Sequence, residues 1–308
     1  MANTNLFMFD KLGQCIKRRY SFLRLCRFIF FLFHIYFRVP QIIMNVVNSN
    51  TMNKPFDFIT TSFAANLSDT YSISIRQLPG GYSFYIKNND GTCIAIKQII
   101  SDHITPQLLK EEPLLLLNYH SASYIGYGPF ALIPKTLVID ENYTTFLPLE
   151  NNLRQRAKTI VNPLTNDILI AAYSNQWTMP NIKCRKYHEV ELLATMALNS
   201  HSANSMWAEI TTQHINIVVI HNHKLQLANT YSISNNDDAA YYILACYQQL
   251  KLSQEEVDLN IIGDLLTINP VPFLTDYIRH INTPQPQNWN AELPNQYAPL
   301  FTLQTNQI

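Results

Sequence analysis

The sequence predicts an internally duplicated α/β protein, and three observations support this. Residues 214–264 read as a strand, a tight turn, a second strand, a capped amphipathic helix and a third strand. Residues 71–117 repeat that order in a weaker form. At 308 residues, the chain is long enough to bury the core of one two-lobed domain or of two domains of ordinary size. Two α/β units in one chain explain all three observations.

The first unit, between residues 71 and 133, begins as three strands joined by two turns. Tyr71, Ile73 and Ile75 alternate with polar residues, the pattern of a strand with one exposed face. Gly, Pro and Asn residues mark turns at 79–81 and 88–91, and a third strand follows at 93–100. Pro106 opens a predicted helix over 105–117. Short apolar runs at 122–127 and 130–133 then return the chain to the sheet.

The middle of the chain is less regular. Residues 167–174 predict a buried strand and residues 189–199 a helix, whereas 177–186 fit either a helix or a loop. The order of these elements in space does not follow from the sequence. Residues 151–213 are therefore treated as connecting elements, and the lobe to which they belong is left open.

The second unit starts with an apolar run at 215–220, which suits a strand buried on both faces. A turn at 221–224 leads to alternating apolar residues, over one or two short strands up to 233. Ser234, with Asp237 three residues later, predicts a capping box, and Asp238 adds favourable charge at a helix start. The helix, a short strand at 259–262 and a closing helix at 271–281 complete the unit. The Pro-, Asn- and Gln-rich tail, 282–308, is predicted to be irregular.

The first 51 residues form a basic and apolar leader outside the predicted fold. The run at 28–37 is apolar apart from His34, but ten helical residues span only about 15 Å of a roughly 30 Å hydrocarbon core. Three interpretations remain open. Translation starts at Met44 or Met52, or the leader is a helix on the membrane surface, or it is an anchor in the inner membrane. Membrane contact is expected only if residues 1–51 are present.

The composition limits the partners and the compartment. The leader holds seven of the 22 basic residues and one of the 22 acids, which leaves 15 basic and 21 acidic residues, a net charge of −6. Such a body argues against nucleic-acid binding, which needs a basic surface. The five cysteines are far apart and include no CxxC pair, so reduced thiols in a cytoplasmic protein are expected. Cys246 falls on the apolar face of a predicted helix, where packing explains it.

From residue 52 onward, the chain resembles an uncharacterised family of Bacteroides-type bacteria, known as domain of unknown function 3822. In residues 214–264, a Tyr-Ser-Ile-Ser segment leads to an Asp-Ala-Ala-Tyr-Tyr helix and then to Leu-Asn-Ile-Ile-Gly. A weaker match begins with Tyr-Ser-Ile-Ser-Ile at 71. That family looks like a divergent relative of the actin-like ATPases, closest in style to pilus-assembly and cell-division adaptors. The resemblance implies two ribonuclease-H-like lobes around a cleft, the first at 52–150 and the second at 214–281.

Actin-like ATPases place an Asp and a Gly in the first hairpin of each lobe, where the acid organises a metal and the Gly admits phosphate. Here the first hairpin turn contains Gly80 and Gly81 but no acid, and Pro79 lacks an amide donor. The second hairpin, taken as 221–224, contains Asn222 and neither an acid nor a glycine. The turn that would contact adenosine keeps Gly263, followed by Asp264. These five residues, Gly80, Gly81, Asn222, Gly263 and Asp264, are the candidate cleft residues.

No catalytic residue and no metal site is predicted elsewhere. His221 and His223 would make a poor metal site without a Cys, Asp or Glu beside them, and Lys224 would repel a cation. Asp237 and Asp238 are explained by helix capping. No nucleotide-binding or nucleophile motif occurs, and sequence neighbours such as His120 and Ser121 rarely form a catalytic group.

The missing hairpin acids favour a non-catalytic adaptor or scaffold that binds a protein partner and needs no cofactor. The alternative is a switch that binds ATP in the cleft and hydrolyses it slowly or not at all.

Overall fold

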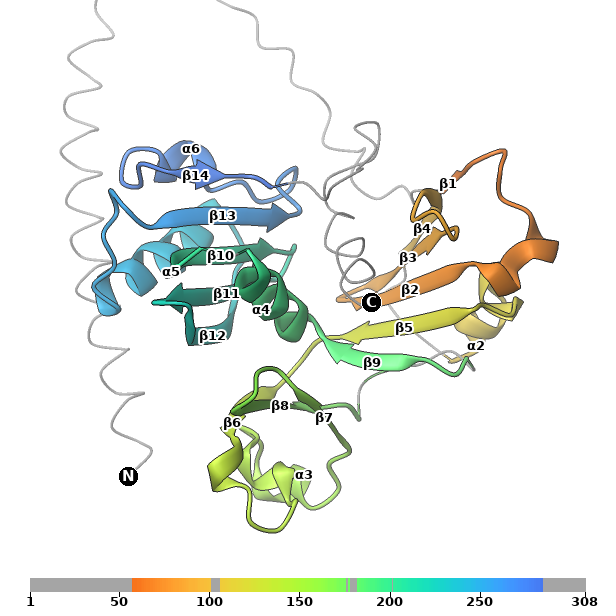
Figure 1. The fold of residues 1–308 in the computed structure, drawn as a ribbon, viewed down its shortest axis with the longest axis horizontal. Helices are drawn as coiled ribbons and strands as arrows, with labels where there is room; N and C mark the ends of the chain where they lie inside the picture. Colours follow the sequence, from red (N-terminus) through yellow and green to blue (C-terminus); the bar gives the residue numbers. More distant parts are fainter. Residues whose placement is uncertain (1–56, 101–105, 176, 178–181, 201, 285–308) are drawn as a thin grey trace, which may run out of the picture. The chain divides into compact units, whose positions relative to one another are not determined.

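The computed structural model describes residues 57–100, 106–175, 177, 182–200 and 202–284, all within the unit Asn53–Ile308. Their strands build a six-stranded, a five-stranded and a three-stranded sheet, called sheets A, C and B (Figure 1). In this part of the chain, no helix is long and apolar enough to cross a membrane. The predictions for the leader and for most of the tail fall outside the described residues.

Sheet A has the strand order β1-β4-β3-β2-β5-β9. Strands β2, β3 and β4 form the predicted antiparallel meander, and β5 and β9 run parallel to β2. Their bounds are Asp57–Ile59 for β1, Ser72–Leu78 for β2, Gly81–Lys87 for β3, Cys93–Ile100 for β4, Ser121–Gly126 for β5 and Arg185–His188 for β9.

Sheet C has the strand order β12-β11-β10-β13-β14. Strands β10, β11 and β12 form an antiparallel meander, and β13 and β14 continue the sheet in parallel pairings. Their bounds are Asn204–Ile210 for β10, His214–His221 for β11, Lys224–Ser232 for β12, Asp258–Gly263 for β13 and Ile281–Asn282 for β14.

The two sheets repeat one topology, which confirms the duplicated α/β prediction. In each sheet the first strand of the meander, β2 or β10, is central, with the rest of the meander on one side and two later strands on the other, and sheet A has β1 as an additional edge strand beside β4. This is the order of a ribonuclease-H-like sheet. The second unit begins at β10, ten residues before the expected start at 214, and β9 also comes from the supposed connecting segment. β10 was missed because Ser205 and Glu209 interrupt its apolar run, although both are buried.

Sheet B is an insertion between β5 and β9 with its own small core. It has the order β6-β8-β7, with β6 at Phe130–Pro134, β7 at Thr159–Pro163 and β8 at Ile168–Tyr173. Three short helices lie between β6 and β7, namely η4 (Lys135–Leu137), η5 (Tyr143–Phe146) and α3 (Asn151–Arg154). Ile133, Leu147 and Ala171 are the buried centre of this core.

The helices follow the predictions in part. Helix α4 spans Glu189–Asn199, as expected, and α5 spans Asn236–Gln249. The helix expected over 105–117 is two short pieces in the described residues, α2 (Pro106–Lys110) and η3 (Pro113–Leu116), because Pro113 cannot continue the first helix. The prediction of a closing helix over 271–281 is wrong. Only α6 (Val271–Leu274) is helical, and strand β14 follows.

Helix α5 begins one residue later than the sequence pattern suggested. Its N-cap is Asn235, whose side-chain oxygen accepts from the Asp238 amide at 2.9 Å. The Asp238 carboxylate in turn accepts from the amide and the hydroxyl of Ser234, at 3.0 and 2.7 Å. Asp238 therefore has the predicted capping role, but Asn235 rather than Ser234 caps the helix. Cys246 lies in the core between α5 and sheet C, as its place on the apolar face predicted.

Gly263 ends β13 in a conformation that only glycine adopts easily, with φ at +104°. A Cβ atom there would lie 2.1 Å from the carbonyl oxygen of Ile210 on the neighbouring strand β10. Backbone atoms cannot move aside as a flexible side chain can. The close approach of β13 to β10 therefore requires glycine at this position.

We expect Gly263→Ala to lower the free energy of unfolding by about 2 to 5 kcal/mol, from backbone strain and the clash together. Gly91→Ala is the matched control, because Gly91 also has a positive φ (+78°) but has nothing within 4 Å of its Cβ direction. That control should lose only about 1 kcal/mol. Urea denaturation measures both values, and equal losses would contradict a packing role for Gly263.

Candidate functional site

The site lies where the first hairpins of the two sheets meet, and Arg76 is its centre. Arg76 stands two residues before the β2–β3 turn, in a strand that the alternation predicted to be exposed on one face. Its side chain is instead only 6% exposed. A guanidinium cannot lose its charge, so its burial requires anionic partners.

Glu209 is the first of these partners and occupies the same place in the second lobe. Arg76 pairs with Ser83 two residues before a two-residue loop, and Glu209 pairs with Asn216 at the corresponding position of the β10–β11 hairpin. The Arg76 Nη1 atom donates to Glu209 Oε1 at 2.5 Å. The other Glu209 oxygen, Oε2, accepts from the side-chain amide of Asn216 at 3.1 Å. The two equivalent hairpin positions thus carry opposite charges that pair directly.

Glu189 is the second anionic partner and joins Arg76 to His214. Arg76 Nη2 donates to Glu189 Oε2 at 3.0 Å, and His214 Nε2 lies 2.6 Å from Glu189 Oε1. With His214 protonated, the two side chains form a close ion pair. Burial opposes protonation of His214, but the charge of Glu189 outweighs it and the pKa of His214 is raised. Burial likewise opposes ionisation of Glu189, but His214 and Arg76 hold its pKa well below the usual range.

With His214 protonated, the four groups contain two positive and two negative charges. Arg76 has a raised pKa, because the attraction of Glu209 and Glu189 exceeds the effect of burial. All four side chains are at most 9% exposed. We call Arg76, Glu189, Glu209 and His214 the charge cluster. It is electrically balanced and contacts sheet A, sheet C and helix α4.

The start of helix α4 fixes Glu189 in the cluster. His188 is the N-cap: its Nδ1 accepts from the Val190 amide at 3.2 Å, while Nε2 contacts the Gly128 carbonyl at 3.0 Å. These contacts require a proton on Nε2, and burial lowers the pKa of His188, so the ring is neutral. The ionised Glu189 then occupies the first helical position, where the helix dipole favours negative charge.

Glu191 completes this helix start. One of its oxygens accepts from the His188 amide at 3.3 Å and from the Asn162 side chain at 2.9 Å. Burial raises the pKa of Glu191 to about 7, although both of these hydrogen bonds favour the charged form. Near neutral pH, this carboxyl therefore carries a proton part of the time.

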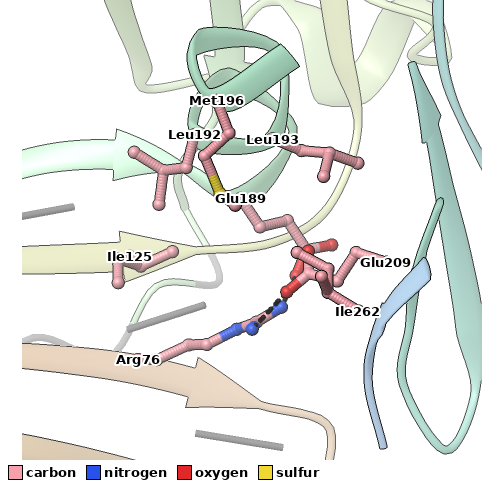
Figure 2. A pocket seen from close by; sticks show the side chains of 8 residues that line it. All are labelled: Arg76, Ile125, Glu189, Leu192, Leu193, Met196, Glu209 and Ile262. Atoms are coloured by element: carbon pink, nitrogen blue, oxygen red, sulfur yellow. Dashed lines mark hydrogen bonds and ion pairs between the residues drawn. The ribbon is translucent and has the colours of Figure 1, made fainter. Parts of the chain in front are cut away.

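The space between the two hairpins is almost filled. Arg76, Glu189 and Glu209 line a cavity of about 10 Å³ together with apolar side chains (Figure 2). The apolar residues are Ile125, Leu192, Leu193, Met196 and Ile262. Such a cavity has about the room of one water molecule. It has no room for a nucleotide in this conformation.

The structure brings four of the five candidate cleft residues to the ends of strands near the charge cluster. Gly80 and Gly81 lie in the β2–β3 turn, after Arg76. Gly263 and Asp264 follow Ile262, which lines the cavity. The Asp264 amide donates to the carbonyl oxygen of Ile210 at 2.8 Å, and its carboxylate accepts from the amide and the hydroxyl of Thr267. Asp264 therefore stabilises the turn in which it lies.

Asn222 is a correction, because it does not lie in the counterpart of the Gly80 turn. Residues 221–224 join the second and third strands of sheet C, and Asn222 contacts Asn204 at the far end of β10. Asn222 and His223 have φ values of +52° and +59°, as a tight hairpin turn requires. The true counterpart contains Thr211, Thr212 and Gln213. In the described residues, no group of three or more His, Cys, Asp or Glu is placed to hold a metal ion.

None of the four cluster residues was a candidate from the sequence. Arg76 was taken as the polar side of an alternating strand, and His214 as the first residue of an apolar one. A usable signal was present: in a chain with only 14% charged residues, a charge inside a predicted strand is unusual. Arg76 is of this kind, whereas Glu209 lies in β10, which the sequence did not predict. Their pairing still depends on contacts more than a hundred residues apart, which strand patterns do not reveal.

The comparisons with known proteins agree with this architecture. The family model described as "Protein of unknown function (DUF3822)" matches residues 60–281. A Bacteroides thetaiotaomicron protein "with actin-like ATPase fold and unknown function" is similar in structure, with a TM-score of 0.57 and 21% identity. The match covers 71% of this chain and 93% of that one. No curated protein is detectably similar in sequence.

A second similar structure is the "PilM-PilN type IV pilus biogenesis complex". Its TM-score is 0.50 at 11% identity, over 75% of this chain and 96% of that one. At such identities, both structures show the fold alone. The fold is thus that of the actin-like ATPases, as the sequence resemblance implied.

Removing the charge of Arg76 should destabilise the protein strongly. We expect Arg76→Met to lower the free energy of unfolding by about 3 to 5 kcal/mol, because it leaves two buried carboxylates with one cation. Arg76→Met combined with Glu209→Met leaves Glu189 paired with His214, so the double variant should regain much of the loss. A double-mutant cycle in urea measures this coupling.

The matched control is Arg279→Met, which breaks an exposed ion pair with Glu255. It should change stability by at most about 1 kcal/mol. A double variant at 76 and 209 that loses the sum of the two single losses would show that the pair does not couple the lobes.

The raised pKa of Glu191 predicts that the stability of the protein depends on pH. Its pKa is about 7 in the folded protein against 4.5 for the free group, so the folded state binds the proton more tightly. The free energy of unfolding therefore decreases progressively as the pH rises from 4.5 to 7, and it stays lower above pH 7. Glu191→Gln keeps an oxygen for Asn162 and His188 but cannot ionise. We expect it to be more stable than the wild type at pH 8, by about 1 to 3 kcal/mol, with little difference near pH 4.5.

Urea denaturation at pH 5 and pH 8 measures this effect, with the exposed Glu256→Gln as the control. His214 titrates in both the wild type and the variant, so it cancels from the comparison. A constant difference between Glu191→Gln and the wild type across the range would show that Glu191 is not the cause.

Proposed function

The chain belongs to the family described as protein of unknown function (DUF3822), and we propose that it is a non-catalytic adaptor or scaffold on an actin-like ATPase fold. The observation that carries this proposal is the Arg76–Glu209 pair. In active members of this fold, the first hairpin of each lobe holds an acid for the metal and a glycine for the phosphate. Here the first-lobe hairpin presents a cation, and it is bound to the acid of the second lobe.

The chemistry of the charge cluster opposes nucleotide hydrolysis. A metal ion between the hairpins would need Glu209, but Arg76 and Asn216 already bind its two oxygens. If a metal ion displaced Arg76 from Glu209, the guanidinium would stay buried but would lose one of its two anionic partners. A nucleotide would also need far more room than about 10 Å³. These costs favour a body whose two lobes stay together without a nucleotide.

A protein partner fits such a body. The similar PilM structure is described in a complex with PilN, which is one example of this fold binding another protein. An adaptor needs a rigid surface rather than turnover, and buried ion pairs between the lobes provide rigidity when all their charges are matched. The alternative, an ATP-dependent switch, requires the charge cluster to open when the nucleotide binds.

The test of this proposal is stabilisation by nucleotide. With 5 mM ATP and Mg²⁺, we expect no magnesium-dependent rise in melting temperature and no phosphate release above that of a Glu209→Gln control. A nucleotide at a hundred times its dissociation constant would add about 2.7 kcal/mol, which a melting curve detects easily. A magnesium-dependent rise, with phosphate release that falls in Glu209→Gln, would overturn the proposal.

The adaptor role has its own measurement. Protein carrying a C-terminal tag is purified from native cells, and its partner is identified by mass spectrometry. We expect the recovered partner to bind the purified protein equally well with ATP, with ADP and without nucleotide. Binding that requires ATP would favour the switch instead.

A further inference from the structure

A second hollow lies at the opposite end of β2 from Arg76. It is an open groove of about 650 Å³ on sheet A, where β2, β5 and β9 begin and β3 ends. This volume falls within the roughly 300 to 1,000 Å³ of small-molecule sites. The polar residues that line it include Ser72, Lys87, Ser121, Ser123, Lys183 and Arg185.

Strand register places most of these side chains on one face of the sheet. Ser72 on β2 pairs with Lys87 on β3 and with Ser121 on β5. Ser123, two residues along β5, pairs with Arg185 on β9. Laterally paired residues point to the same side, as do residues two apart in a strand. A row of hydroxyl and cationic groups therefore crosses four adjacent strands.

The groove is basic although the body of the protein is acidic. Three of the 15 basic residues of the body line it, Lys87, Lys183 and Arg185, together with His120, and no carboxylate among the described residues does. Lys183 and Arg185 are exposed, and neither forms an ion pair with any other described residue. Partial burial lowers the pKa of Lys87, so a positive charge there has a cost that a bound anion would offset.

The donors in the groove suit phosphate. Arginine offers a planar fork that binds two oxygens at once, lysine offers a compact charge, and serine hydroxyls donate to the remaining oxygens. The Ser121 hydroxyl donates to the Ser72 oxygen at 2.8 Å, so the Ser72 proton is not used in that bond. We propose that this groove binds a small molecule that carries a phosphate or polyphosphate group. The proposal does not rest on the closed space between the hairpins.

The test uses pyrophosphate as the probe, in titration calorimetry at about 50 mM salt, because exposed charges are screened at higher salt. We expect saturable binding with a one-to-one ratio. Lys183→Gln combined with Arg185→Gln should weaken it at least about tenfold, since two charged contacts are lost. The control, Lys135→Gln with Arg156→Gln, removes the same charge from exposed sites outside the groove and should bind as the wild type does.

Melting curves without ligand verify that both double variants are folded. No saturable binding of pyrophosphate would overturn the proposal, and so would equal weakening in the two double variants, which would indicate net charge alone. Citrate at the same ionic strength distinguishes phosphate from carboxylate chemistry. Citrate binding as tight as that of pyrophosphate would overturn the assignment to phosphate.

This experiment also separates the groove from the hairpin site. ATP carries a triphosphate, so it is expected to bind the groove weakly without any role for the charge cluster. Stabilisation by ATP that is lost in Lys183→Gln, Arg185→Gln supports the groove and leaves the non-catalytic proposal intact. Magnesium-dependent stabilisation that persists in this variant and falls in Glu209→Gln would contradict the non-catalytic proposal alone.

Discussion

The structure depends on how a permanent positive charge, that of Arg76, is accommodated between two sheets. Burying an isolated guanidinium would cost several kcal/mol even after the protein relaxes. Glu209 and Glu189 remove most of that cost, and His214 balances the second carboxylate. Each buried charge is acceptable only while a charge of opposite sign balances it. The lobes and the start of helix α4 are therefore linked by one electrostatic requirement rather than by apolar contact alone.

The duplicated topology is what allows this arrangement. Two sheets of the same order present equivalent positions of their first hairpins, and here those positions hold Arg76 and Glu209. In an actin-like ATPase, like charges at these positions would repel each other unless a cation lay between them. The guanidinium of Arg76 supplies that positive charge covalently. The two hairpins of this chain are in this way joined by an ion pair between their own side chains.

How much could be predicted from the sequence differs between the fold and the site. Turn residues and alternation located β2, β3 and β4, and the helical pattern at 189–199 located α4, because these signals are local. β10 escaped prediction because Ser205 and Glu209 break its apolar run, and the burial of Glu209 depends on its ion pair with Arg76 of the other lobe. With β10 missed, the turn after β11 was taken for the first hairpin and Asn222 became a candidate. The charge cluster was out of reach because its members meet only through tertiary contacts.

One face of β2 connects the two sites and explains why its alternation was misleading. Ser72, Ser74 and Arg76 share that face, and polar residues at every second position predict exposure to water. Ser74 and Arg76 are instead buried, and only the end at Ser72 opens into the basic groove. A polar face covered at one end must have its charges matched within the protein. At the open end the same chemistry is available to a ligand, which is why we place the proposed anion site in the groove rather than in the space between the hairpins.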